Sequence, residues 1–175
     1  ASLATGSPAV HARLLRNRGI LAPGYFDDVT AAAGVGLDGV VGSAPGTFSA
    51  ASRFADLDAD GYADLVITGN FGTSRLFWNN GDGSFTDGTI AAGVGTEESG
   101  TGSAIGDVDG DGRLDWFVTG VYDPLHMCNA DTCHWGTSGN RLYRNLGSRT
   151  FVHVTSESGV RVGGVGAGAT FIDYV

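Results

Sequence analysis

Two nine-residue segments of this 175-residue chain, residues 56–64 and 107–115, share one pattern of aspartates. Each has aspartate at its first, third, fifth and ninth positions and glycine at its sixth, where a sharp turn is needed. Alternate carboxylates of a tight loop can converge on one centre, and Ca²⁺ takes about six to eight oxygen ligands. We call these segments the first and second Asp loops. Their predicted Ca²⁺ ligands are the carboxylates of Asp56, Asp58, Asp60, Asp64, Asp107, Asp109, Asp111 and Asp115 and the backbone carbonyls of Tyr62 and Arg113.

The residues that follow each loop exclude the helical calcium motifs. An EF-hand has a bidentate glutamate at position 12, where this chain has Ile67 in one copy and Val118 in the other. The apolar runs 65–67 and 116–118 instead predict a buried strand after each loop, so the loop joins strand to strand. Plain solvated Asp-Gly turns are the alternative. Four acids in register, repeated in the same apolar frame, argue against that alternative.

The elements that position these loops form a longer repeat. An Arg-Leu segment recurs at 13–19, 75–81 and 141–147, and a segment that begins with phenylalanine follows it at 26–35, 85–94 and 151–160. A strand of small residues is expected before each loop, at 49–55, 102–106 and 166–172. The turn at 80–83, Asn-Gly-Asp-Gly, suits a hairpin with positive φ. The unit is therefore about four short strands long.

Four antiparallel strands in a repeat of this length are typical of a β-propeller blade. The sequence thus predicts an all-β fold of four-stranded antiparallel blades with Asp-rich calcium loops, in a propeller that is incomplete in this chain. The expected parts are the end of a first blade (about 13–35), a second blade (45–94), a third blade (100–160) with an insertion at 121–140, and the start of a fourth (161–175). Because so few blades leave apolar faces exposed, we expect either a longer domain or several assembled copies.

The start of a third calcium loop is also expected. Asp173 aligns with Asp56 and Asp107 as a first ligand, whereas Val175 stands at the third position.

Composition narrows the range of functions. The net charge of −9 comes from sixteen aspartates and three glutamates, and there is no lysine. The ten arginines are spread along the chain, so no nucleic-acid footprint is predicted. No apolar stretch has the length of a membrane span. The start at Ala1, without a leader, is consistent with a mature secreted product or a fragment, and calcium loops of low affinity suit an extracellular or cell-surface location.

The insertion at 121–140 carries the only cysteines of the chain, Cys128 and Cys133. A local disulfide is the simplest prediction for this pair. A zinc or copper site formed with His126 and His134, and a lengthened haem c attachment string, stay open as alternatives. Tyr122 and Trp135 are candidate contact residues for a partner, although Trp135 could equally pack over the disulfide.

Together these residues resemble a known family. The string from Phe54 to Leu65, followed by the Arg-Leu segment 75–85, is similar to the FG-GAP or VCBS repeat of integrin α-subunit propellers and their bacterial relatives. The segment that begins with phenylalanine and ends Val-Thr-x-x-x-Gly-Val is most similar to the cartilage acidic protein and UnbV-type branch. The resemblance implies a calcium-stabilised propeller, secreted or at the cell surface, that acts in adhesion or binds proteins or glycans. It also implies the ligand set given above for the two loops.

The predicted function is a non-enzymatic extracellular module for adhesion, protein or glycan binding, or a structural role, with a structural Ca²⁺ in each loop. The chain has no Gly-x-Ser-x-Gly, His-Glu-x-x-His or Gly-x4-Gly-Lys-Ser/Thr motif, and its glycine run 163–168 aligns with a small-residue strand. One alternative is the non-catalytic propeller part of a larger secreted enzyme. The other is a lectin that stacks sugars on Trp78, Trp116 or Trp135, of which Trp78 and Trp116 are expected in the core.

Overall fold

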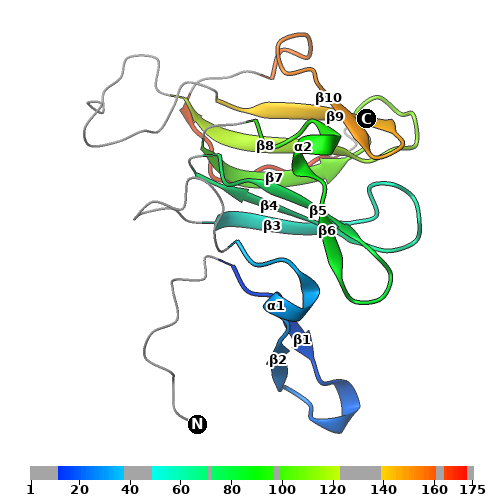
Figure 1. Ribbon diagram of the computed structural model, residues 1–175. Coiled ribbons are helices and arrows are strands. Elements are labelled where there is room, and N and C mark those ends of the chain that lie inside the picture. The colour runs from blue at the N-terminus through cyan, green and yellow to red at the C-terminus, as the bar shows by residue number, and fades with distance from the viewer. Residues whose placement is uncertain are drawn as a thin grey trace.

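Two antiparallel sheets pack against each other in the computed structural model, and a two-stranded hairpin lies beside them (Figure 1). The structure describes residues 12–37, 49–70, 72–96, 99–122, 139–160 and 164–172. Its strands are β1 (Leu15–Asn17), β2 (Phe26–Asp28), β3 (Ser49–Ala55), β4 (Asp64–Gly69), β5 (Arg75–Asn79), β6 (Phe85–Asp87), β7 (Gly100–Gly106), β8 (Asp115–Tyr122), β9 (Arg141–Gly147), β10 (Thr150–His153) and β11 (Gly164–Val165). Its short helices are η1 (Gly19–Leu21), α1 (Thr30–Ala33) and α2 (Thr89–Ala92).

Each of the two large sheets contains four strands that follow one another along the chain. The first has the order β3-β4-β5-β6, and the second contains β7, β8, β9 and β10 in the same succession. Their registers match: Leu65 pairs with Phe77 in the first sheet, and Trp116 pairs with Tyr143 at the equivalent position of the second. The predicted all-β fold of four-stranded antiparallel sheets is confirmed. The division of the chain into numbered blades stays a prediction.

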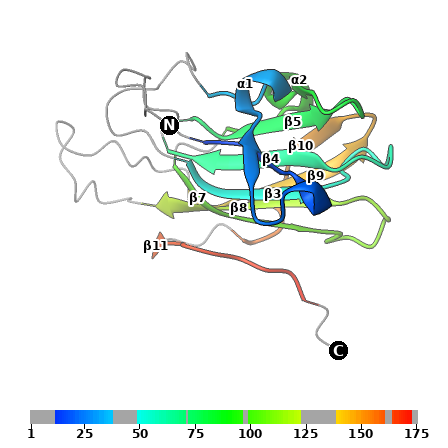
Figure 2. The same cartoon turned by 90° about the horizontal axis from the view of Figure 1, so that it is seen from below.

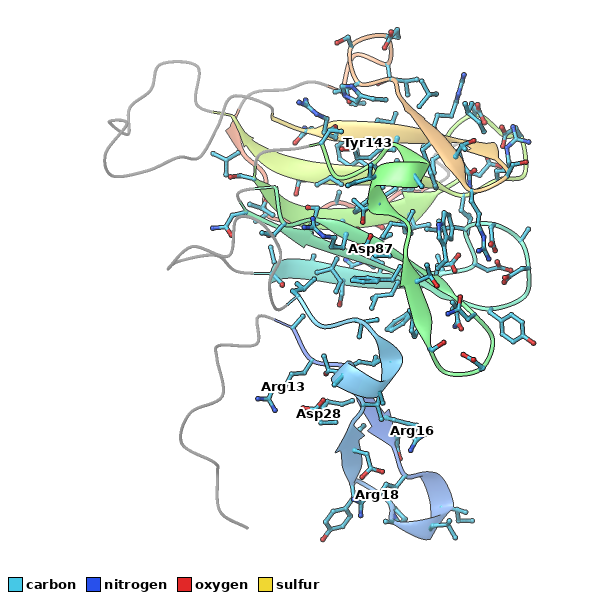
Figure 3. All side chains as sticks on the ribbon, viewed as in Figure 1. Arg13, Arg16, Arg18, Asp28, Asp87 and Tyr143 are labelled. Carbon is cyan, nitrogen blue, oxygen red and sulfur yellow. The ribbon has the colours of Figure 1, made fainter. Side chains whose placement is uncertain are left out.

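The β1–β2 hairpin corresponds to the last two strands of such a sheet. It pairs Asn17 with Phe26, as the first large sheet pairs Asn79 with Phe85. Figure 3 shows Arg13 and Asp28 pointing toward each other on this hairpin, with 3.0 Å between Nη1 and Oδ2. The same pair recurs as Arg75 and Asp87 at 3.7 Å. At least one partner of each pair is exposed, so the pairs contribute little stability, but they show that the repeat extends to individual side-chain contacts.

The one-turn helices α1 and α2 are not among the elements that the sequence analysis predicted. They follow the Phe strands, and each ends at a glycine with positive φ, Gly34 (74°) and Gly93 (77°). The first threonine of each helix accepts a hydrogen bond from the backbone of the Arg-Leu strand, over 2.8 Å at Thr30 and 2.9 Å at Thr89. The Thr-x-x-x-Gly spacing was the available signal, because a glycine in the left-handed region commonly ends a helix.

The structure corrects one predicted strand. Residues 166–172 were expected to form a strand before a third loop, yet none of them does. The strand nearby, β11, consists of Gly164 and Val165, which precede this range and pair with Tyr122 and Val121 of β8. The rest of the segment runs along the β7–β8 side toward the C-terminus (Figure 2). Among the described residues no strand pairs with it, and an extended segment without a ladder partner is not a strand. Its Phe171 packs edge-on against Phe117, with ring centroids 6.1 Å apart.

The main core lies between the two large sheets. Val66, Leu76 and Trp78 of the first sheet contact Trp116 and Tyr143 of the second, and all five side chains are buried. The opposite face of the first sheet packs on the segment around α1 through a second cluster: Ala33, Val35, Leu37, Leu65, Ile67 and Phe77. Successive units thus cover one another face to face, as propeller blades do.

Small residues let β7 approach β4 and β8 closely. A Cβ built on Gly100 would lie 3.1 Å from the Thr68 side chain of the first sheet and 3.1 Å from Val118. A Cβ on Gly102 would lie 2.6 Å from the hydroxyl of Thr119. Side chains of the neighbouring strands therefore leave no room for a Cβ at Gly102 and little room for one at Gly100.

Candidate metal centres

Both Asp loops connect strands as predicted, the first from β3 to β4 and the second from β7 to β8. They lie at the same end of the sheets as the β5–β6 and β9–β10 turns (Figure 1). In each loop three carboxylates come together, with one oxygen from each within 4.8 Å of the others: Asp56, Asp58 and Asp64 in the first loop, and Asp107, Asp109 and Asp115 in the second. The first, third and ninth positions thus form two equivalent oxygen clusters.

The first aspartate of each loop shapes the turn. Asp56 accepts backbone hydrogen bonds from Asp60 (3.1 Å) and Gly61 (2.9 Å), and Asp107 accepts the equivalent bond from Gly112 (2.8 Å). Gly61 and Gly112 have φ of 92° and 84°, which glycine adopts without strain. These hydrogen bonds, chiefly the one from Gly112, hold the pKa of Asp107 below its usual value. The loop therefore presents an ionised carboxylate to its centre.

The ninth aspartate is buried and joins the loop to the sheet. Asp64 accepts hydrogen bonds from the backbone of Leu57 (2.9 Å) and Asn79 (2.8 Å), and its side chain is fully buried. Asp115 does the same in the second loop, where Asn145 donates over 2.7 Å. Burial raises the pKa of Asp64 and of Asp115, because the charged form loses its solvation. A cation in the cluster would offset that cost.

The fifth aspartate stands outside each cluster in this structure. Asp60 accepts a hydrogen bond from the backbone of Tyr62 over 2.9 Å, and Asp111 accepts the same bond from Arg113. The Arg113 guanidinium also pairs with the Asp111 carboxylate. The roles of Asp60 and Asp111 as ligands, and of the Tyr62 and Arg113 carbonyls, stay predictions.

The donor set fits a hard cation. Both clusters consist of carboxylate oxygens, without the nitrogen or sulfur ligands that zinc and copper prefer. Ca²⁺ accepts an irregular shell of oxygens at about 2.3–2.6 Å. Two Asp-rich groups in equivalent loops are therefore compatible with two bound calcium ions.

Asn145 links the two loops across the sheet interface, a role that the sequence analysis did not assign. Its Nδ2 donates to the carbonyl of Leu57 in the first loop (2.7 Å) and to the carbonyl of Leu114 in the second (3.0 Å). The side chain is 1% exposed. The recurrence of asparagine at 79 and 145 was visible in the Arg-Leu repeat, but the partner at Leu57 comes from packing.

Replacing Asn145 by alanine should lower the free energy of unfolding by about 1–3 kcal/mol, because it leaves buried carbonyls without a donor. Urea unfolding in the presence of a calcium chelator measures the change. Asn79→Ala is the matched control, since Asn79 is partly exposed and its Nδ2 donates, within the described residues, to the carbonyl of Ala63 in the first Asp loop (2.9 Å) and not across the interface. Equal losses in the two variants would contradict a contribution from the bond across the interface.

Arg149 is a second residue that the sequence analysis missed. It lies in the β9–β10 turn, and its Nε is 2.5 Å from Asp58 Oδ2 in the first Asp loop. Its guanidinium also lies over the Trp78 ring, 5.2 Å from the centroid. The sequence did contain a signal for it, because Arg149 stands at the turn position where the preceding repeat has Gly83.

Several predicted features lie outside the described residues. These are Asp173 and Val175 of the third loop, the disulfide or metal ligands Cys128, Cys133, His126 and His134, and the contact residue Trp135. Trp78 and Trp116 are described and are 4% and 0% exposed. Both are core residues, as expected, and neither ring is available to stack on a sugar. No helix in the described part of the chain is long and apolar enough to cross a membrane.

Comparison with known families bears on the loops directly. Residues 56–118 match the model of the FG-GAP-like repeat family. The match begins at Asp56, the first aspartate of the first loop, and ends at Val118 in β8, so it covers both Asp loops. It supports the FG-GAP part of the resemblance and a β-propeller type of module. A search of curated proteins found no match to the chain.

Proposed function

We propose that this chain is an extracellular, non-enzymatic β-propeller module in which each Asp loop holds a structural Ca²⁺. The observation that carries the proposal is the convergence of three carboxylates at the same positions of two loops, with the same backbone hydrogen bonds to the ninth aspartate. A plain solvated Asp-Gly turn does not need three converging carboxylates, so finding them in both loops argues against that alternative. The FG-GAP-like match over residues 56–118, which covers the same two loops, also supports it.

Calcium would stabilise the folded state by binding to the two carboxylate clusters. Each cluster collects three carboxylates at the end of a sheet, and their mutual repulsion opposes folding. A divalent cation bound only by the folded chain removes this repulsion and adds its binding free energy to stability. The ion would also join the two strands that the loop connects.

Thermal unfolding with saturating calcium and with a chelator tests the proposal. At about 100 times Kd each site adds about 2.7 kcal/mol, so chelation should lower Tm by roughly 5–10 °C per site. Calorimetric titration should find about two sites in wild type, and one each in Asp58→Ala and Asp109→Ala. Magnesium, which demands a smaller octahedral shell, should shift Tm much less. Unchanged Tm with no heat of binding would refute the calcium assignment.

The ligand of the module is proposed by class only. We propose that it binds a protein or a glycan on the cell surface or in the extracellular space, or serves as a structural module, with self-assembly of several copies as a further way to complete the propeller. The FG-GAP-like match supports this class of role, and the burial of Trp78 and Trp116 favours a protein ligand over sugar stacking on those rings. We also propose that the chain belongs to the cartilage acidic protein and UnbV-type branch.

A further inference from the structure

Arg149 brings a positive charge from the second sheet onto the first Asp loop. Besides its contact of 2.5 Å with Asp58, its Nη2 lies 3.4 Å from Asp60 Oδ2. The Asp58 side chain is 7% exposed, whereas that of Arg149 is 45% exposed. The guanidinium therefore covers the Asp58 carboxylate from the solvent side and neutralises it across the interface.

The position of Arg149 is held by more than this ion pair. Its guanidinium stacks on Trp78, a ring that is itself packed against Phe151 in the same interface. Ser148 and Arg149 have φ of 51° and 61°, in the left-handed region where side chains are disfavoured. The preceding turn has glycine, Gly83, at the place of Arg149. Glycine would adopt this backbone conformation without strain, whereas arginine is strained in it. The contacts of the Arg149 side chain therefore offset the free-energy cost of the strained backbone.

The carboxylate that Arg149 covers is one of the three that would bind calcium. The Arg149 guanidinium, whose Nε lies 2.5 Å from Asp58 Oδ2, competes with a cation for that carboxylate oxygen. A fixed positive charge beside the cluster also raises the electrostatic free energy of a second cation there. An arginine guanidinium is always protonated in proteins, so Arg149 keeps its positive charge beside the cluster.

The second Asp loop differs in this respect within the described residues. The arginine that reaches Asp109 is Arg144, and its Nη1 is 3.9 Å from Asp109 Oδ2. Arg113 belongs to the loop itself and pairs with Asp111, which lies outside the carboxylate cluster. No arginine of the described chain covers a cluster carboxylate of the second loop as closely as Arg149 covers Asp58.

We propose that Arg149 is a built-in counter-cation of the first Asp loop, which stabilises the calcium-free form and which calcium must displace from Asp58. Two consequences follow, and both depend on the calcium sites proposed above. The first loop binds calcium more weakly than the second. Its occupancy also changes the contact between the two sheets, because the arginine that leaves Asp58 belongs to the β9–β10 turn.

Calorimetric titration of single-site proteins tests the proposal. Asp109→Ala leaves the first loop as the binding site, and Asp58→Ala leaves the second. In the Asp109→Ala background, Arg149→Ala should tighten calcium binding by about threefold to tenfold at low ionic strength, and less at high salt. In the Asp58→Ala background the same change should alter Kd by less than about twofold.

Two further variants control for backbone strain and for the loss of an arginine elsewhere. Arg149→Gly restores the residue of the preceding turn, so it removes the side chain without backbone strain and should tighten binding as Arg149→Ala does. Arg144→Ala is the matched control in the Asp109→Ala background and should leave first-loop affinity unchanged. In chelator, Arg149→Gly should lower Tm, and saturating calcium should remove most of that difference.

The outcomes separate this inference from the proposed function. Weaker calcium binding in both Arg149 variants would show that the arginine organises the loop for the metal, and unchanged binding would show that it does not compete. Either result would overturn the inference while the calcium sites stand. Absence of calcium binding in wild type and in both single-site proteins would instead refute the proposed function.

Discussion

Asp115→Ala should lower the free energy of unfolding by about 2–4 kcal/mol even when calcium is chelated. The reason lies in the protein's own hydrogen bonds. The two carboxylate oxygens accept from the backbone of Val108 (2.8 Å) and Asn145 (2.7 Å), and the Asp115 side chain is fully buried. Alanine leaves the buried N–H of Asn145 without an acceptor, which costs about 1–3 kcal/mol. It also removes a bond worth about 1 kcal/mol to the N–H of Val108, a residue that is 39% exposed.

Urea unfolding in chelator, compared with Asp109→Ala, measures this structural contribution. Asp109 lies in the same loop, is exposed, and is held only by the 3.9 Å contact with Arg144 among its described ion pairs. We expect Asp109→Ala to change stability in chelator by less than about 0.5 kcal/mol, yet to abolish calcium binding at that loop. Asp115→Asn, which keeps one acceptor oxygen, should fall between the two. If Asp115→Ala and Asp109→Ala unfold alike in chelator, the hydrogen bonds of the ninth aspartate do not contribute the predicted stability.

Trp116→Ala should cost about 3–5 kcal/mol, the range for removal of a buried aromatic side chain. Trp116 is 0% exposed and its ring centroid lies 5.6 Å from that of Tyr143. The indole N–H donates to the Ser103 hydroxyl over 2.9 Å, so alanine also leaves a buried hydroxyl without this donor. The lost area lies at the interface of the two sheets, and the loss should therefore be similar with and without calcium.

Trp116→Phe is the conservative comparison for this prediction. It keeps most of the apolar volume but not the indole N–H, and about 1–2 kcal/mol is expected. Equilibrium unfolding by urea, followed by far-ultraviolet circular dichroism, measures both variants. An intact fold in Trp116→Ala together with lost sugar binding would contradict the core assignment and favour a lectin.

Because the chain repeats, most strands of this fold could be predicted from the sequence. The apolar runs after each Asp loop, the Arg-Leu segments and the Phe segments became β4, β5 and β6 and their equivalents β8, β9 and β10. Strands of this kind follow from local pattern, because alternating or continuous apolar residues between turn signals have few other stable conformations. The same local logic placed the carboxylates of Asp56, Asp58 and Asp64 in one cluster, since they are close in the chain.

Two local details were not predicted although the chain contained their signals. The helices α1 and α2 follow from threonine and glycine at fixed spacing, a weaker signal than the apolar strands around them. The segment 166–172 has the composition of the other small-residue strands but is not one, because a strand exists only where another strand pairs with it. Composition alone carries no information about that partner.

The sequence by itself determined the repeat, the strands and the two aspartate clusters, all of which depend on residues near one another in the chain. The tertiary structure alone decided which side chains meet across the sheet interface. Asn145 reaches Leu57 and Arg149 reaches Asp58, contacts between residues about ninety positions apart. Such contacts depend on how one sheet packs on the next, and that packing gives two loops with the same aspartate and glycine pattern different electrostatic surroundings.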